Sequence, residues 1–336
     1  MSNRRTFVKQ IASTTATLAV GGNLAFGGPR NKESQISLSS GVLQPENPLI
    51  LFDNFHVSNR ASYSWKAKFA AAKHAGFDGF EFAVVDPETD SWKEGIELFW
   101  EQNFKTWGFH WTTKAVVDGK APEIDAEVEK IIRNIELLAK MPIKPYFTLS
   151  LSGKDELSGA TIAESGSAKA DERHWERAYK IISAFDKACN DNNIIGSLYP
   201  HIDWICDTPQ SAFKILKGAK ANTIGSAFCS HHWYANKTSD DLGVVLANPY
   251  MKRLAYVVLT NAHFTPTSFS AVRFNEGEMD MAWVLAKLYE FGYSGPISTQ
   301  GWGIGGDPFI ACKQFVDTIR ALRKRFEEHP ELNPLN

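Results

Sequence analysis

Polar side chains stand at the ends of eight apolar segments of this chain, where parallel strands would stop. They are His56, Glu81, His110, Ser150, His201 with Asp203, His231 with His232, Asn261 with His263, and Gln300. If the segments close into a barrel, their carboxyl ends meet at one mouth, and groups far apart in the sequence become neighbours. Imidazoles, a carboxylate and an amide in one pocket can bind a divalent metal or pass protons to and from a sugar.

Three of these residues are predicted to carry out the chemistry. His201 and His232 are candidate bases or metal ligands, because imidazole titrates near neutral pH. Glu81 is a second candidate base. Since neighbouring residues of a strand point to opposite faces, only one of His231 and His232 is expected to enter the mouth.

Six other side chains are predicted to bind the substrate. Amides hydrogen-bond sugar hydroxyls or a developing oxyanion, and indole rings stack on the apolar C–H faces of sugars. Imidazoles at further strand ends would complete the pocket. The candidates are Gln300, Asn261, Trp233, Trp302, His56 and His110.

The elements that must position these residues alternate between strand and helix eight times. Continuous apolar runs indicate buried strands, and apolar residues spaced three and four apart indicate helices. The predicted strands are residues 48–55, 77–84, 106–111, 144–151, 194–201, 223–231, 253–261 and 296–300. The predicted helices lie around residues 65–72, 92–103, 124–138, 178–185, 212–219, 242–246, 281–288 and 315–326.

The connections between these elements favour one fold class. Links from helix to strand are short, as at residues 190–193 and 218–222, whereas links from strand to helix are long, as at 152–172 and 262–278. This asymmetry is typical of a (β/α)8 barrel, which builds its function on the loops after the strands. A doubly wound open sheet is the competing fold, but no glycine-rich phosphate fingerprint follows the first strand. The prediction is α/β, a single-domain (β/α)8 TIM barrel over residues 48–330.

Residues 1–28 are predicted to be a twin-arginine signal peptide, followed by a linker over residues 29–47. Arg4-Arg5 precedes Phe7 and Lys9, and a mildly apolar run extends from Ile11 to Phe26. That order is typical of twin-arginine export signals; the alternative is a charged N-terminal helix with a chance arginine pair. The run is shorter than the ~20 residues that span a bilayer. The sequence therefore predicts an exported, periplasmic protein with no stable membrane span after signal removal.

The balance of charge argues against a nucleic-acid partner. The chain has 36 Lys+Arg and 38 Asp+Glu with interspersed signs, whereas a nucleic-acid surface needs a basic stripe. Its four cysteines have neither metal-type spacing nor the density of a disulfide scaffold. A small carbohydrate is the expected partner, and a homo-oligomer is compatible with the sequence.

Four short motifs give the chain a resemblance to a known superfamily. They are Ala75 to Glu81 (AGFDGFE), Tyr199-Pro200-His201, His232-Trp233, and Gly292 to Ile297 (GYSGPI). In this order they resemble the xylose isomerase-like TIM barrel superfamily over about residues 49–325, and more narrowly its exported sugar phosphate isomerase/epimerase branch. That branch is related to lyases that act on 3-keto-glycosides.

The resemblance implies a divalent metal, often Mn²⁺ or Mg²⁺, held by a Glu, an Asp, a His and a second Glu from strands five to eight. At the matching positions this chain has, in order, Tyr199, Cys229, Asn261 and Gln300. Loss of the carboxylates removes the negative charge that holds a hard cation. Either the metal is absent, or a softer site built from His201, His232 and their neighbours replaces it, with Zn²⁺ as a further candidate.

The predicted function is that of a sugar isomerase/epimerase-like enzyme. It would abstract a proton α to a carbonyl in a non-phosphorylated sugar or an oxidised (3-keto) glycoside, as an isomerase, an epimerase or a carbon–oxygen lyase. The alternative is a non-catalytic carbohydrate-binding barrel with a degenerate metal site. An endonuclease of the same superfamily would need a dense zinc cluster and a basic groove, and the sequence shows neither.

Overall fold

The computed structural model describes residues 46–56, 63–83, 85–236 and 241–335. The chain divides into two units, Met1–Val42 and Leu43–Asn336, and the second contains every described residue. The predicted signal peptide and nearly all of the predicted linker lie outside the described residues. Asn47 belongs to the folded unit, since it is buried and its side-chain amide donates to the carbonyl groups of Tyr293 and Gly295, at 3.1 and 2.8 Å.

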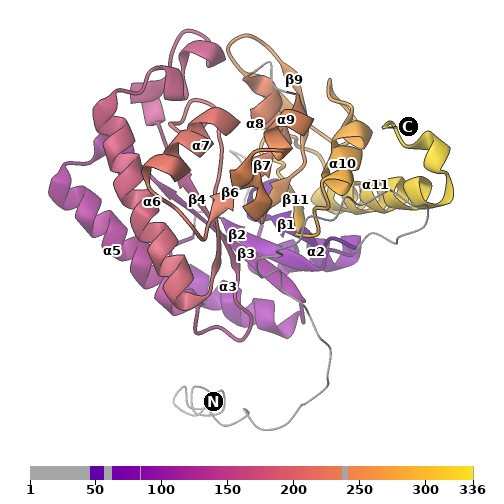
Figure 1. Ribbon diagram of the computed structural model, residues 1–336. Helices are drawn as coiled ribbons and strands as arrows, with labels where there is room; N and C mark the ends of the chain where they lie inside the picture. The colour runs from indigo at the N-terminus through magenta and orange to yellow at the C-terminus, as the bar shows by residue number, and fades with distance from the viewer. Residues whose placement is uncertain (1–45, 57–62, 84, 237–240, 336) are drawn as a thin grey trace, which may run out of the picture. The chain divides into compact units, whose positions relative to one another are not determined.

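Among the described residues, nine parallel strand segments form a ring, with the helices outside it (Figure 1). Around the ring the order is β6, β5, β4, β3, β2, β1, β11, β8 and β7. The bounds are β1 Leu49–Phe52, β2 Gly79–Ala83, β3 Thr106–Thr113, β4 Tyr146–Leu151, β5 Ile195–Leu198, β6 Gly225–Ser226, β7 Phe228–Cys229, β8 Val257–Val258 and β11 Ile297–Thr299.

The ring closes through the residues from Gly225 to Cys229. β6 pairs with β5, β7 pairs with β8, and Ala227 alone separates β6 from β7. The N–H of Ala227 donates to the carbonyl of Leu198 at 2.8 Å, so these five residues act as one bent strand. Counted in this way the ring has eight strands, and the predicted (β/α)8 TIM barrel is confirmed.

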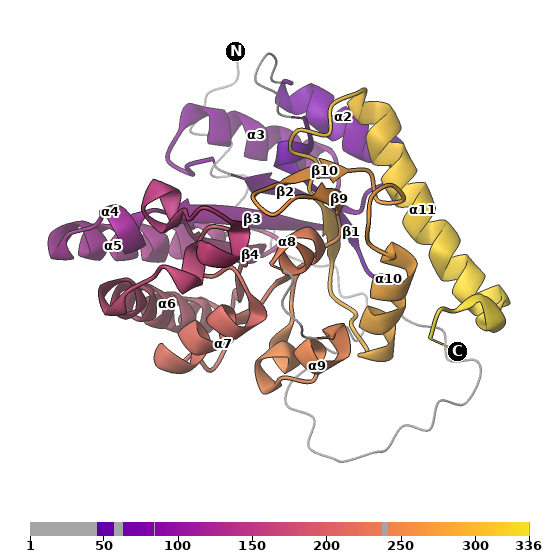
Figure 2. The same ribbon diagram turned by 90° about the horizontal axis from the view of Figure 1, so that it is seen from above.

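The helices surround the ring except α8, which lies near the middle in the view from above (Figure 2). They are α2 Trp65–Ala75, α3 Asp90–Glu101, α4 Ala115–Asp118, α5 Ala121–Leu138, α6 Glu172–Asn192, α7 Pro209–Gly218, α8 Ser230–Ala235, α9 Leu242–Leu246, α10 Met281–Glu290 and α11 Pro308–Glu328. Short 3-10 helices are η1 Asp53–His56, η2 Lys154–Leu157, η3 Ile162–Glu164, η4 Gly166–Ala168, η5 Pro249–Arg253 and η6 Pro330–Leu332. None of the described helices combines the length and apolar character that crossing a bilayer requires.

The main core lies between the strands and the surrounding helices. On α2, Phe69 packs edge-on against Phe80 and Phe82 of β2, with ring centroids 5.0 and 6.1 Å apart. Trp107 of β3 continues this layer against Phe82. These rings are fully buried, and each contributes roughly 1.5–3 kcal/mol through removal from water. The continuous apolar runs in the sequence reflect this packing, because strands of a closed parallel barrel are covered on both faces.

One predicted strand, residues 253–261, is partly wrong. Its beginning is the end of the 3-10 helix η5, its middle supplies the two residues of β8, and Asn261 begins an antiparallel hairpin. The hairpin consists of β9 (Asn261–Phe264) and β10 (Phe269–Val272). It forms because the long connection after β8 has enough residues to fold back and pair with itself, which sequence periodicity alone did not reveal.

The hairpin meets the long loop after β4 at the mouth of the barrel. The N–H of Ile162, in η3, donates to the carbonyl of Pro266 at the hairpin turn, at 3.0 Å. Ile162 also packs with Ile202 and Ala235, and Phe264 and Phe269 lie against this small apolar cluster. We call these five apolar residues the cover. The loops after β4 and β5, the hairpin after β8, and α8 therefore meet above the strand ends.

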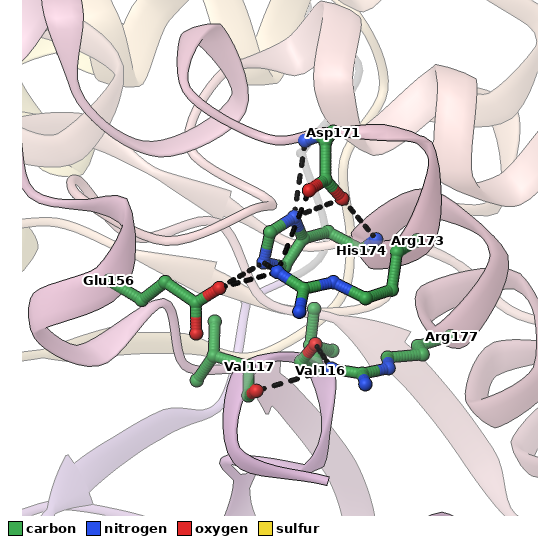
Figure 3. Close-up of polar contacts among 7 residues, drawn as sticks. All are labelled: Val116, Val117, Glu156, Asp171, Arg173, His174 and Arg177. Atoms are coloured by element: carbon green, nitrogen blue, oxygen red, sulfur yellow. Dashed lines mark hydrogen bonds and ion pairs between the residues drawn. The ribbon is translucent and has the colours of Figure 1, made fainter. Parts of the chain in front are cut away.

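Polar contacts fix the long loop to the start of α6 (Figure 3). The ring of His174 lies between two carboxylates, with Nδ1 2.7 Å from Asp171 and Nε2 2.9 Å from Glu156. Arg173 adds a 2.7 Å contact to Glu156, while Arg177 donates to the carbonyl groups that end α4. Glu156 lies in η2, so this cluster holds the loop that carries η3 and the cover.

Candidate functional site

The candidate site lies at the carboxyl ends of β5, β7 and β11, together with the first turn of α8. Its side chains are Tyr199, His201, Cys229, His231, His232 and Gln300. The rings of His201 and His232 have centroids 4.1 Å apart, and those of His231 and His232 are 4.0 Å apart. The Tyr199 hydroxyl lies 3.3 Å from Cys229 Sγ and 3.4 Å from Gln300 Oε1. The structure thus brings together His201, His232 and Gln300, as the sequence predicted for a common mouth.

Both His231 and His232 enter this cluster, contrary to the expectation that only one would. The strand ends at Cys229, and residues from Ser230 onward form α8. The alternation of side chains applies to strands and not to a helix, where successive residues are rotated by about 100°. Both imidazoles are fully buried as a result.

Burial keeps all three imidazoles neutral near pH 7. Loss of hydration lowers the pKa of His201 to about 4, and the His110 ring adds a smaller effect in the same direction. The same desolvation, with His201 nearby, lowers the pKa of His231 to about 3. The pKa of His232 is also lowered well below its usual value, by burial and by its two imidazole neighbours. Neutral rings have a free nitrogen lone pair, which a base or a metal ligand requires.

The tautomer of His201 follows from its contacts. Its Nδ1–H donates to the carbonyl of Ile202 at 2.7 Å, which leaves the lone pair of a neutral ring on Nε2. The indole ring of Trp204 stacks on the imidazole of His201, with the two ring centroids 3.9 Å apart and the ring planes inclined by 17°. The ring is therefore held in one orientation, and His201 keeps a partly exposed edge.

Tyr199 and Cys229 occupy two of the positions where the resemblance implies carboxylates. Burial raises the pKa of Cys229 to about 12 and that of Tyr199 well above its usual value. Both side chains are therefore protonated at neutral pH and can act as hydrogen-bond donors. Cys229 Sγ also lies 3.4 Å from Nδ1 of His231.

A second polar network lies deeper in the barrel, around Glu81. Thr148 donates its hydroxyl to Glu81 at 3.0 Å, so Nδ1–H of His110 must donate to Thr148, at 2.9 Å. In the neutral ring, Nε2 of His110 then accepts from Ser150 at 2.9 Å. Tyr256 donates a further bond to Glu81. Glu81 is fully buried and its two oxygens have donors within the chain, so it does not face the mouth as a free base.

Gly108 of β3 leaves the room that Glu81 needs. A Cβ atom at this position would lie 2.9 Å from Cγ of Glu81, a distance that real Cβ atoms do not adopt. The strand position therefore requires a residue without a side chain. Neither this close approach nor the Tyr256–Glu81 bond could be read from the sequence, because both depend on the register between strands.

Sequence reasoning also missed a buried ion pair at the end of β1. Nζ of Lys68 lies 2.5 Å from Asp53, and the two side chains are 10% and 6% exposed. Burial raises the pKa of Asp53, while the Lys68 ammonium acts against that rise. Asp53 directly follows β1, so the rule of polar residues at strand ends could have identified it. His56, three residues further on, was predicted instead. The side chain of His56 lies outside the described part of the structure.

The remaining predicted substrate-binding residues occupy different places. The amide of Asn261 is fully used inside the chain: it donates to Phe274 and Met279 carbonyls at 3.3 and 3.0 Å and accepts from two backbone N–H groups. It therefore fixes the hairpin loop. Trp233 lines a small pocket with Cys229 and other residues, and its indole nitrogen is buried without a partner among the described residues. Trp302 lies on the loop after β11 and is 52% exposed.

The cover closes over the imidazoles. The ring of Phe269 has its centroid 5.0 Å from that of His231 and 5.5 Å from that of His232. Phe269 is carried by the hairpin, so the hairpin covers one side of these two rings. Gln300 and His201 keep partial exposure beside it.

Comparison with known proteins places this geometry in a family. The family model of the xylose isomerase-like TIM barrel matches residues 69–325. The chain belongs to this family. A search of curated proteins finds no match.

Solved structures share the fold at low sequence identity. L-ribulose 3-epimerase is 14% identical, with a TM-score of 0.64, over 85% of this chain and 98% of that one. The 3-keto-D-glucoside 4-epimerase from E. coli is 14% identical, with a TM-score of 0.59, over 84% and 100%. A xylose isomerase-like protein from Mycobacterium smegmatis, in complex with magnesium, is 13% identical, with a TM-score of 0.58, over 83% and 97%. At these identities the similarity establishes the fold.

The residues present do not suit a hard cation such as Mg²⁺. Such ions prefer oxygen ligands, and carboxylates above all. At the implied positions the chain places a phenol, a thiol and two amides, and the amide of Asn261 is already bonded to the backbone. Among the described residues, one group of three His, Cys, Asp or Glu side chains could hold an ion: Cys229, His231 and His232, whose ligand atoms lie within 4.8 Å of one another.

Proposed function

We propose that this protein is an enzyme that moves a proton at the carbon next to a carbonyl group in a non-phosphorylated carbohydrate. The substrate would be a free sugar or an oxidised (3-keto) glycoside. The observation that carries the proposal is the state of His201, a neutral imidazole whose Nδ1–H is fixed by Ile202 and whose Nε2 is free at the mouth. An imidazole with a defined tautomer is the usual form of a general base.

In the proposed reaction, Nε2 of His201 removes the proton from the α-carbon and the C–H electron pair moves into the enolate. The enolate oxygen then needs donors, because the C–H group is only weakly acidic. The amide N–H groups of Gln300, after β11, and the hydroxyl of Tyr199, after β5, are the proposed donors. Since a pKa of about 4 makes His201 a weak base, strong support of the enolate by such donors is essential.

The fate of the proton decides the type of reaction. Protonation of the same carbon on the opposite face, by water or a second acid while His201 keeps the first proton, gives an epimer. Return of the proton from His201 to the neighbouring carbon, with a proton shift between the two oxygens, gives an isomer. Loss of an oxygen substituent from the β-carbon instead gives elimination, with the proton leaving on the departing alcohol. All three share the first step, which the site is proposed to support.

An experiment with solvent deuterium tests this proposal. The chain without residues 1–28 is incubated in D₂O with 3-keto-glucosides and with common free sugars, and deuterium incorporation and aglycone release are followed. At least one of the two signals is expected for the native protein and for the exposed control His329→Gln: incorporation for an epimerase or isomerase, and aglycone release for a lyase. His201→Gln should lose them by ~100-fold or more, the usual contribution of a general base. Native protein that shows neither signal with any of these carbohydrates contradicts the proposal.

A carbohydrate-binding barrel without turnover is the alternative, and the replacement of carboxylates by Tyr199, Cys229 and Gln300 favours it. In that case the native protein binds a sugar in calorimetry, and His201→Gln changes only the affinity. The deuterium experiment separates the two, since binding alone transfers no proton.

We also propose that the protein is exported by the twin-arginine route to the periplasm, on the strength of Arg4-Arg5 and the apolar run after them. Cell fractionation with an Arg4→Lys/Arg5→Lys variant tests this. Export of the variant at the native level contradicts it.

A further inference from the structure

We propose that Cys229, His231 and His232 form a binding site for Zn²⁺, in place of the carboxylate site for a hard cation that the fold implies. The ion is recognised by one sulfur and two nitrogen donors at the end of β7 and the start of α8. The proposal does not rest on the carbohydrate reaction, since none of its three ligands is the proposed base, although the site adjoins His201 and Tyr199.

The spacing of the donors suits a small tetrahedral ion. Zn–S and Zn–N bonds of about 2.3 and 2.0–2.1 Å place sulfur and nitrogen ligands about 3.5 Å apart in a tetrahedron. Cys229 Sγ lies 3.4 Å from Nδ1 of His231, and one donor atom from each of the three side chains lies within 4.8 Å of the other two. All three side chains are at most 1% exposed, so the donors are held in place by packing.

His232 provides the independent sign that a ligand is missing. Its ring is fully buried, yet Nε2 has no hydrogen-bond partner within the described chain. A buried polar atom without a partner is unfavourable, typically by ~1–3 kcal/mol. An ion bound at Nε2 removes this penalty.

Binding at Nε2 requires the neutral ring of His232 to carry its proton on Nδ1. In the described part of the chain this gives up one contact, from the N–H of Ile202 to Nδ1, which at 3.5 Å is at the upper limit of a hydrogen bond. The change of tautomer neither gains nor loses a proton. The Cys229 thiol does lose one on ligation, so each bound ion releases about one proton to solvent.

The surroundings support a charged site with these ligands. The hydroxyl of Tyr199, 3.3 Å from Sγ, can donate to the thiolate and orient it, as partners behind metal ligands usually do. The Glu81 carboxylate interacts electrostatically with the same sulfur. A Zn²⁺ ion bound to one thiolate keeps a net charge of about +1, and the negative charge of Glu81 offsets it. A thiolate and imidazoles favour Zn²⁺ over Mg²⁺ and Mn²⁺.

Titration of chelator-treated protein with metal ions tests the site. The folded native chain is titrated with Zn²⁺, Mn²⁺ and Mg²⁺ in competition with a coloured chelator, and with Co²⁺ while the absorption spectrum is recorded. One Zn²⁺ per chain is expected, bound at least ~100-fold more tightly than Mn²⁺. Co²⁺ should produce the near-ultraviolet band of thiolate-to-metal charge transfer. Stoichiometric Mn²⁺ binding that matches or exceeds that of Zn²⁺, or no binding of either ion, overturns the proposal.

Variants locate the sulfur ligand. Cys229→Ser should lose the thiolate band, whereas Cys312→Ser, an equally buried thiol in α11, should keep it. Tyr199→Phe should keep the band and bind Zn²⁺ about tenfold more weakly, since the partner of the thiolate is removed. A band that persists in Cys229→Ser, or that is lost in Cys312→Ser, contradicts the assignment.

A measurement on the native chain covers the case in which Cys229→Ser does not fold. Alkylation of the four thiols is followed by mass spectrometry at a mild denaturant concentration, with and without Zn²⁺. Zn²⁺ should slow the modification of Cys229 more than that of Cys189, Cys206 or Cys312. Equal protection of all four overturns the proposal. None of these readouts involves a carbohydrate, so a metal site without sugar turnover, or turnover without a metal site, is recognised as such.

Discussion

Tyr256 donates its phenolic hydroxyl to the carboxylate of Glu81, across the interior of the barrel and 175 positions along the chain. Thr148 supplies a second donor at 3.0 Å, and the Nδ1 atom of His110 lies 3.6 Å from the same oxygen. A carboxylate that is fully buried is tolerated only when such partners are present. Glu81 therefore links three strands beneath the mouth, and its charge depends on groups from β3, β4 and the residue before β8.

Replacement of Tyr256 by Phe removes one of these donors and leaves an oxygen of Glu81 without a partner in a buried place. We expect the free energy of unfolding to fall by about 1–3 kcal/mol, the usual effect of an unsatisfied buried group. Urea unfolding measures the change. Tyr146→Phe is the matched control, because its ring packs on Tyr256 but is not bonded to Glu81, and it should change stability by less. Equal effects of the two variants would show that the bond to Glu81 contributes little.

The barrel could be predicted because its strands are buried on both faces and appear as continuous apolar runs. Runs such as 144–151 and 296–300 correspond to β4 and β11, and the helix stripe from Ile124 to Leu138 lies within α5. The hairpin after β8 was missed, since its strands are half-exposed and short and lie in a segment that resembles an ordinary long loop. Propensity does not separate such a hairpin from a loop.

The sequence predicted which strand ends contribute to the candidate site for some residues and did not predict the geometry of the site. A polar residue at a strand end indicates proximity to the mouth, which correctly grouped His201, His232 and Gln300. Whether a side chain is free for a ligand depends on its partners: Asn261 is bonded to the backbone of its own loop, and Glu81 is enclosed by hydroxyl groups. Such partners come from register and loop conformation, which a single sequence does not reveal.

Stability should fall as the pH is lowered from about 6.5 towards 4. In the unfolded chain the imidazoles of His201, His231 and His232 have pKa values near 6.5, whereas in the fold those of His201 and His231 are about 4 and 3. Between these values the unfolded chain binds protons that the folded chain does not, so unfolding is favoured by up to ~1.4 kcal/mol per pH unit for each ring. The raised pKa values of Asp53 and Asp207 act in the opposite direction.

Urea midpoints of the chelator-treated protein, measured from pH 8 to 4.5, check this dependence. The midpoints are expected to be constant above pH 7 and to decline below it. His231→Asn should make this decline shallower, because one of the three imidazoles that contribute to the slope is removed. Midpoints that stay constant from pH 8 down to 5 would contradict the prediction, because they would mean that the folded and unfolded chains take up the same number of protons over this range.

Activity should persist to lower pH than an ordinary histidine base allows. If His201 is the base, the rate requires its deprotonated form and falls only as the pH decreases through about 4. We expect kcat/KM to be nearly constant between pH 8 and 5.5, where an exposed imidazole would already lose most of its activity. Rates are compared with the folded fraction at each pH, and an acid limb near 6.5 with intact fold would exclude His201 in its observed environment.

Removal of Phe269 should open the way to the buried imidazoles. Its ring packs on both His231 and His232, so Phe269→Ala leaves a gap in the cover. We expect histidine-specific acylation of these two residues, mapped by mass spectrometry, to become faster than in the native chain. Phe309→Ala, an exposed ring at the start of α11, should leave the rates unchanged. Unchanged rates in Phe269→Ala would place the access route elsewhere.

The ion pair between Lys68 and Asp53 should stabilise the fold only as a pair. Both side chains are nearly buried, so Lys68→Met leaves a carboxylate without its counter-ion, and we expect a loss of about 3–5 kcal/mol in the free energy of unfolding. Asp53→Asn should also destabilise, by leaving the ammonium unpaired. The double variant Asp53→Asn/Lys68→Met removes both charges and should recover much of the loss, because a buried pair gains little net energy over neutral groups of similar volume. Urea unfolding of the four chains gives the coupling energy, and additive effects of the two single changes would show that the residues do not depend on each other.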